Sequence, residues 1–211
     1  MSLMDIQQLS SFIAQSKRTI MHIQLKILRE GEYSLTDIAP LYECHEIRSL
    51  DLGVGGQLVN TADLQFQRMA QAWPHLRELS VVTEAWRDDA WTVTFEGGEL
   101  TPVSLDVLHP FALHCPELSE VRITGIGAPP TTYPVLPLQA GVVQASMIHF
   151  KLDDLSNDVA KAADVARLLD GLYPDREIRF LGDSRYATRV RKALHKHRRL
   201  RLELENAQEL E

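Results

Sequence analysis

The sequence predicts an α/β fold in which five or six helix–strand units follow one another along the 211 residues. One short pattern, with apolar residues at positions one, four and six, recurs along the chain. Its last two positions have the period of two that a strand with one buried face requires. The copies are Ile20, Ile23 and Leu25; Ile47, Leu50 and Leu52; Leu76, Leu79 and Val81; Leu118, Val121 and Ile123; and, more weakly, Met147, Phe150 and Leu152.

Helices are expected before most of these strands, because apolar residues there recur at helical spacing. A further helix precedes a sixth strand, expected at Ile178 and Phe180. The predicted helices are 6–13, 35–41, 64–73, 105–115 and 162–172, with Asp63, Ser104 and Asn157 as candidate N-caps. Proline follows three helix ends, after Trp73, Cys115 and Tyr173, where it stops the helix.

The spacing of the strands predicts how the units are arranged. The first five copies begin 27, 29, 42 and 29 residues apart. A helix, a turn and a strand at this period are typical of a leucine-rich-repeat solenoid, in which stacked units share one core. We therefore predict a single domain over 1–211, an α/β solenoid of about five to six degenerate units. The long gap indicates an insertion near 83–103. The alternative is a single layered α/β domain whose units happen to have similar lengths.

The charge is unevenly distributed. Residues 1–184 hold 25 acidic and 14 basic residues, residues 185–201 hold eight basic and no acidic residues, and four glutamates follow. We expect a basic capping segment over 185–204, formed by a solvated terminal helix and then an edge strand through Leu200, Leu202 and Leu204. An alternative is that the basic segment binds an acidic partner or nucleic acid. The residues for that site are Arg189, Arg191, Lys192, Lys196 and Arg198.

The order of these features resembles the C-terminal leucine-rich-repeat region of the F-box proteins abundant in mushroom-forming fungi. The stretches that carry the resemblance are 9–25, 35–52, 73–79, 105–118 and 165–174. The resemblance implies the substrate-recognition part of a ubiquitin-ligase receptor. Nothing before Leu9 has the length of an F-box, so binding of the ligase adaptor is expected only if an F-box lies upstream. Arg176 also departs from the pattern, because it stands where an apolar residue belongs.

Motifs for catalysis, metal binding and cofactor binding are weak. Gly182-Asp183-Ser184 resembles the nucleophile block of small serine esterases, but no suitable histidine element follows it. Cys44-His45 and His114-Cys115 lack the ligand number of a zinc site, and both cysteines occupy the slot of Trp73, which favours packing. We therefore predict no enzyme activity, no catalytic residue, no metal and no cofactor.

The remaining prediction is a non-catalytic protein-interaction module. The outward side chains of the strands would form a concave face for a protein segment, acidic early in the chain and cationic late. They are His22, Gln24, Ser49, Asp51, Glu78, Ser80, Glu120, Arg122, His149 and Lys151, with Glu177 and Arg179 on the last strand. Trp86 and Trp91 are candidate anchors. With two cysteines and no signal or membrane segment in sight, we expect a cytoplasmic or nuclear protein.

Overall fold

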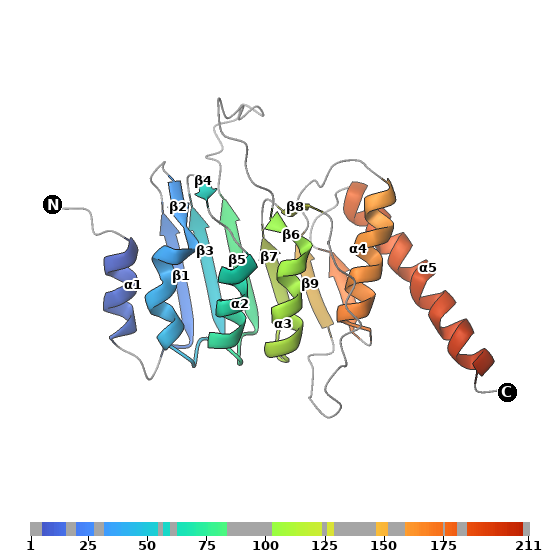
Figure 1. Cartoon of the computed structure of the whole chain (residues 1–211), viewed down its shortest axis with the longest axis horizontal. Helices are drawn as coiled ribbons and strands as arrows, with labels where there is room; N and C mark the ends of the chain where they lie inside the picture. Colours follow the sequence, from blue (N-terminus) through green and yellow to red (C-terminus); the bar gives the residue numbers. More distant parts are fainter. Residues whose placement is uncertain are drawn as a thin grey trace.

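The computed structural model describes residues 6–15, 20–27, 32–54, 57–59, 63–83, 103–123, 126–128, 147–151, 159–174, 176–180 and 185–208. Its centre is a six-stranded parallel sheet whose strands lie side by side in chain order (Figure 1). These strands are β1 (His22–Ile27), β3 (Ser49–Val54), β5 (Glu78–Thr83), β7 (Glu120–Ile123), β9 (Met147–Lys151) and β10 (Glu177–Phe180). Two small parallel sheets accompany it, β2 (Glu32–Ser34) with β4 (Gln57–Val59) and β6 (Val103–Ser104) with β8 (Ile126–Ala128).

The helices form a row along one face of this sheet (Figure 1). They are α1 (Ile6–Ala14), the 3₁₀ helix η1 (Leu35–Glu43), α2 (Asp63–Ala72), the short 3₁₀ turn η2 (Leu105–Val107), α3 (Leu108–His114) and α4 (Val159–Leu172). The last helix, α5 (Arg185–Gln208), packs on α4 and extends beyond it. Their order along the sheet follows the chain order of the strands.

The prediction of a leucine-rich-repeat solenoid is wrong, and the alternative of a single α/β domain with a parallel sheet fits. A solenoid stacks equivalent units, whereas the connections here differ in kind. They include a nine-residue 3₁₀ helix, a ten-residue α-helix, a 3₁₀ turn followed by seven α-helical residues, and a 14-residue α-helix. The triplet of apolar residues indicates only that a strand has one buried face. Any α/β fold with helices on one face of its sheet requires such strands, whether or not its units repeat.

The core lies between the sheet and the helices, and four side chains close the turns that lead into the strands. Cys44, Trp73, Cys115 and Tyr173 are all fully buried at these corresponding positions, as their shared slot in the sequence predicts. The indole Nε1 of Trp73 donates a hydrogen bond to the Leu41 carbonyl at 3.2 Å, which ties two successive connections together. The buried side chains at these helix-to-strand turns therefore help to fix the distance between neighbouring strands.

The structure corrects one further expectation and explains one departure from the sequence pattern. The predicted edge strand through Leu200, Leu202 and Leu204 is wrong, because these residues belong to α5. Arg176 is buried although its side chain is charged, since it replaces apolar packing with hydrogen bonds. It donates to the carbonyls of Leu118 and Pro116, both at 2.7 Å, and its guanidinium lies over the Tyr173 ring.

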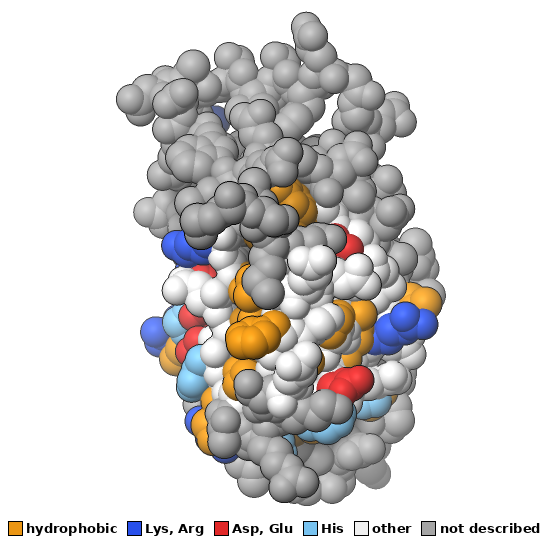
Figure 2. Space-filling view, turned by 90° about the vertical axis from the view of Figure 1, so that its left-hand side faces the viewer, with side chains coloured by type: hydrophobic (Ala, Val, Ile, Leu, Met, Phe, Trp, Pro, Cys, Tyr) orange, Lys and Arg blue, Asp and Glu red, His pale blue; other side chains and the backbone are white. Residues whose placement is uncertain are grey.

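The end of the sheet beside β1 exposes hydrophobic side chains, which Figure 2 shows near the centre of that surface. Phe12 of α1 and Met21 just before β1 are exposed there. Within the described ranges, no helix is both long enough and apolar enough to cross a membrane.

Candidate functional site

The candidate site is the face of the sheet that the helices leave uncovered. Residues alternate along each strand, so that Leu50, Leu79 and Val121 are buried toward the helices while their neighbours point away. The register of the strands aligns the outward residues in two rows. The first row is His22, Ser49, Glu78, Glu120, His149 and Arg179, and the second is Gln24, Asp51, Ser80, Arg122 and Lys151.

A hollow of about 420 Å³ lies on this face over β1, β3, β5 and β7. It is lined by all the residues predicted for the concave face except His149 and Lys151 on β9 and Glu177 and Arg179 on β10. The lining also includes Ile23, Leu50 and Leu79, which the sequence analysis assigned only to the core. The side chains of Leu50 and Leu79 are fully buried toward the helices, so the polar residues form the accessible surface of the hollow.

Hydrogen bonds across the strands fix two of the carboxylates in the hollow. Nε2 of Gln24 donates to Oδ2 of Asp51 at 2.8 Å. The hydroxyl of Ser49 donates to Oε2 of Glu78 at 2.9 Å. Each bond joins residues in the same row on neighbouring strands, so the two acidic groups are oriented by the sheet itself. Pre-oriented carboxylates bind a cationic group with less loss of side-chain entropy.

Two acidic residues occupy neighbouring positions in the middle of the first row. Glu78 and Glu120 are register partners on β5 and β7, and neighbouring strands lie about 4.8 Å apart. Glu120 also forms an ion pair with Arg122. The lining as a whole contains three carboxylates, Asp51, Glu78 and Glu120, and one guanidinium, that of Arg122. The hollow is therefore acidic, and two acidic residues occupy paired positions at its centre.

Arg77 fixes the relative position of the strands that carry these carboxylates. Its carbonyl accepts hydrogen bonds from the amides of Ser119 and Glu120, at 2.8 and 3.0 Å, where β7 begins. Its guanidinium donates two hydrogen bonds to Oε2 of Glu117, at 2.8 and 2.6 Å. Those bonds are the main reason that the pKa of the Glu117 carboxyl is lowered, with a smaller contribution from His75 and an opposing one from desolvation.

Basic residues also occur at register positions on the strands beyond the hollow. Arg122 is the register partner of Lys151, and His149 is the register partner of Arg179. Arg179 also forms an ion pair with Glu177 on the same strand, at 2.7 Å. The gradient from acidic to cationic residues stays a prediction, since Arg122 lies within the hollow beside Glu120 and Arg179 is paired with Glu177.

The other predicted residues lie on α5 or outside the described residues. Arg189, Arg191, Lys192, Lys196 and Arg198 lie on α5. Trp86, Trp91 and the Gly182-Asp183-Ser184 motif lie outside the described residues, as does Asn157. Both cysteines are buried free thiols, and burial raises the pKa of Cys115 to about 12. Among the residues that the structure describes, no cluster of histidine, cysteine and acidic side chains has the composition of a metal site.

Comparison of the chain with protein families, with curated proteins and with solved structures finds no match.

Proposed function

We propose that the protein is a non-catalytic protein-interaction module that binds a segment of another protein on the uncovered face of its sheet. The observation that carries this proposal is the pair of carboxylates Glu78 and Glu120, which are register partners at the centre of an acidic hollow. Like charges on neighbouring strands disfavour folding. A bound cationic side chain would relieve this repulsion, so the partner segment carries lysine or arginine.

The layout of the face supports a segment rather than a small molecule. The hollow is open, is lined by four strands and continues into the cationic residues of β7 to β10. A segment lying across the strands would place a basic residue over Glu78 and Glu120 and an acidic residue near Arg122 and Arg179. Complementary charge of this kind sets specificity and association rate more than affinity.

The resemblance of the sequence to F-box substrate receptors points in the same direction, toward binding of a protein substrate in the cytoplasm or nucleus. The finer proposal is that this chain recognises substrates for a ubiquitin ligase. This finer proposal requires that the ligase adaptor co-purify with the protein from the cells in which the protein is naturally expressed.

The test compares two charge reversals in the endogenously tagged protein. Glu78→Lys reverses a carboxylate in the hollow, and Glu46→Lys reverses an exposed one outside the hollow. Co-purifying proteins are quantified by mass spectrometry. We expect partners that are lost with Glu78→Lys and retained with Glu46→Lys. Equal recovery with both variants would contradict the proposal, and recovery of the ligase adaptor would decide the finer one.

A further inference from the structure

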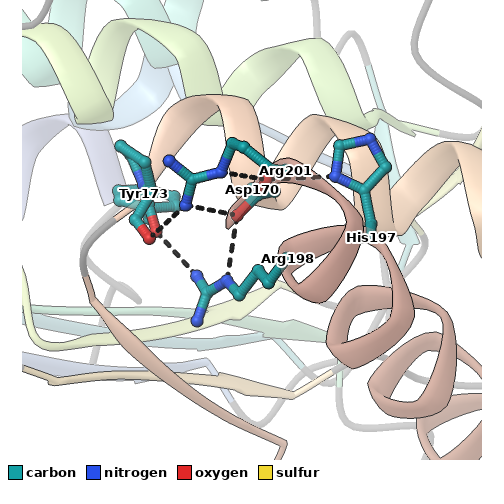
Figure 3. Close-up of polar contacts among 6 residues, drawn as sticks. Asp170, Tyr173, His197, Arg198 and Arg201 are labelled. Carbon is teal, nitrogen blue, oxygen red and sulfur yellow. Dashed lines mark hydrogen bonds and ion pairs between the residues drawn. The ribbon is translucent and has the colours of Figure 1, made fainter. Parts of the chain in front are cut away.

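Helix α5 carries a second charged surface, distinct from the sheet face, and the structure divides its basic residues between two sides. The inward side is anchored on Asp170 of α4, whose side chain is only 3% exposed (Figure 3). Nε of Arg198 donates to Asp170 at 2.9 Å, and His197 and Arg201 approach the same carboxylate at 3.1 and 3.2 Å. Arg198 and Arg201 also donate to the backbone carbonyls of Tyr173 and Pro174.

The outward side of α5 holds a row of cations that these contacts do not use. We call Arg185, Arg189, Lys192, Lys196 and Arg199 the basic stripe. They alternate at four- and three-residue spacing, which places them on one face of a helix. At 1.5 Å per residue the stripe is about 21 Å long. Arg189 is half-buried and the other four are exposed. Arg199 pairs with Glu203 at 3.0 Å.

Exposed leucines lie to one side of this face near the end of the helix, whereas Glu203 continues the alternating spacing of the stripe. Leu200 and Leu204 follow Lys192 and Lys196 at successive four-residue steps, and their side chains are 47% and 66% exposed. Figure 1 shows this part of α5 extending away from the sheet and α4. The outward face is therefore basic from Arg185 to Arg199, ends at Glu203, and has the two leucines along one flank.

From this pattern we infer that the outward face of α5 is a docking site for an acidic amphipathic helix of a protein partner. Carboxylates at the same alternating spacing on a second helix would lie opposite the basic stripe, as charged flanking residues do in paired helices. Apolar residues at one end of that helix would cover Leu200 and Leu204.

Nucleic acid fits these features less well. It would neutralise the cations but leave the leucines exposed. Tyr186, the one tyrosine, phenylalanine or tryptophan of α5, is buried, so the helix exposes none of these large rings for stacking on bases. The acidic body over 1–184 would also repel a polyanion that extends past the helix.

The test uses the full chain and two synthetic helical peptides of identical composition. The matched peptide carries glutamates at alternating four- and three-residue spacing on one face, with two leucines at one end. The other peptide distributes the same residues around the helix. We expect the matched peptide to bind at least tenfold more tightly, as measured by fluorescence anisotropy. Equal binding of the two peptides, no binding of either, or tighter binding of poly(U) RNA would overturn the inference.

Two double variants locate the binding. Lys192→Glu with Lys196→Glu reverses the centre of the stripe, and Arg68→Glu with Arg167→Glu makes the same change in net charge on exposed residues of α2 and α4. We expect the stripe variant to lose at least tenfold in affinity for the matched peptide and the control to lose less than threefold. Equal losses would overturn the inference. Circular dichroism checks the fold, and Lys192→Ala with Lys196→Ala replaces the stripe variant if it unfolds.

Discussion

Glu78 and Glu120 are register partners on adjacent strands of the sheet, and both line an acidic hollow. Glu78 accepts a hydrogen bond from Ser49, and Glu120 forms an ion pair with Arg122. Like charges at paired positions of neighbouring strands lower the free energy of unfolding. A bound positive group would offset this cost.

The first prediction concerns this pair. Glu78→Gln removes one charge and keeps an oxygen that can accept the Ser49 hydroxyl. We expect the free energy of unfolding to stay the same or to rise by up to about 1 kcal/mol, as measured by urea denaturation. A fall larger than this would mean that the carboxylate stabilises the fold and is not held against repulsion.

The second prediction concerns Arg176. Arg176→Met would leave the buried carbonyls of Leu118 and Pro116 without these donors. We expect the free energy of unfolding to fall by about 2–4 kcal/mol. Arg179→Met is the control, since Arg179 is exposed and pairs only with exposed Glu177 among the contacts described, and it should change stability by less than about 1 kcal/mol. Similar effects of both variants would show that burial of Arg176 contributes little.

The third prediction concerns the anchor of α5. Asp170→Asn keeps the shape of the side chain but removes the charge that holds Arg198 and Arg201. We expect a loss of about 2–4 kcal/mol, since a buried partner is removed while both arginines keep some contact with solvent. Hydrogen exchange should accelerate selectively in 194–204. Asp164→Asn, at an exposed pair with Arg167 on the same helix, should leave that exchange unchanged.

The fourth prediction concerns alkaline pH. Burial raises the pKa of the Cys115 thiol and of the Tyr42 hydroxyl to about 12 each, above their ordinary values of 9.0 and 10.0. The unfolded chain therefore releases these protons at a lower pH than the folded protein does. The free energy of unfolding should be constant with respect to these groups below pH 9 and should fall between about pH 9 and 12. Stability that rises over this interval would contradict the burial of both groups.

The same burial predicts slow thiol chemistry. Cys44 and Cys115 are both buried and free. With a disulfide reagent at pH 8, we expect the folded protein to react far more slowly than the denatured chain, in which the reagent can reach both thiols. Rapid reaction of either thiol in the folded protein would show that this cysteine is accessible to the reagent and not buried.

The strands and the side chains of the uncovered face could be predicted from the sequence because alternation along a strand is local. Residues such as Ser49 and Asp51 had to lie on the same face once Leu50 and Leu52 were assigned to the core. Their alignment with Glu78 in rows followed from the equal offsets of the apolar triplets, since β1, β3 and β5 pair without a shift in register.

The arrangement of the helices and the role of α5 could not be predicted in this way. Apolar spacing at 35–41 indicated a helix but did not distinguish η1, a 3₁₀ helix, from an α-helix. The alternating leucines at 200–204 indicated a strand, whereas α5 continues there after Arg198 and Arg201 bind Asp170, some 30 residues earlier in the chain. Arg176 was an anomaly in the pattern because its partners, the carbonyls of Pro116 and Leu118, are distant in sequence.

The central claim, that the acidic hollow binds a cationic protein segment, is tested most directly by selection from a random peptide library on the immobilised protein. The account predicts that selected peptides are enriched in lysine or arginine, that Glu78→Lys abolishes the enrichment, and that Glu46→Lys preserves it. Selection of peptides without a preference for positive charge, or the same preference with Glu78→Lys as with the unmodified protein, would contradict it.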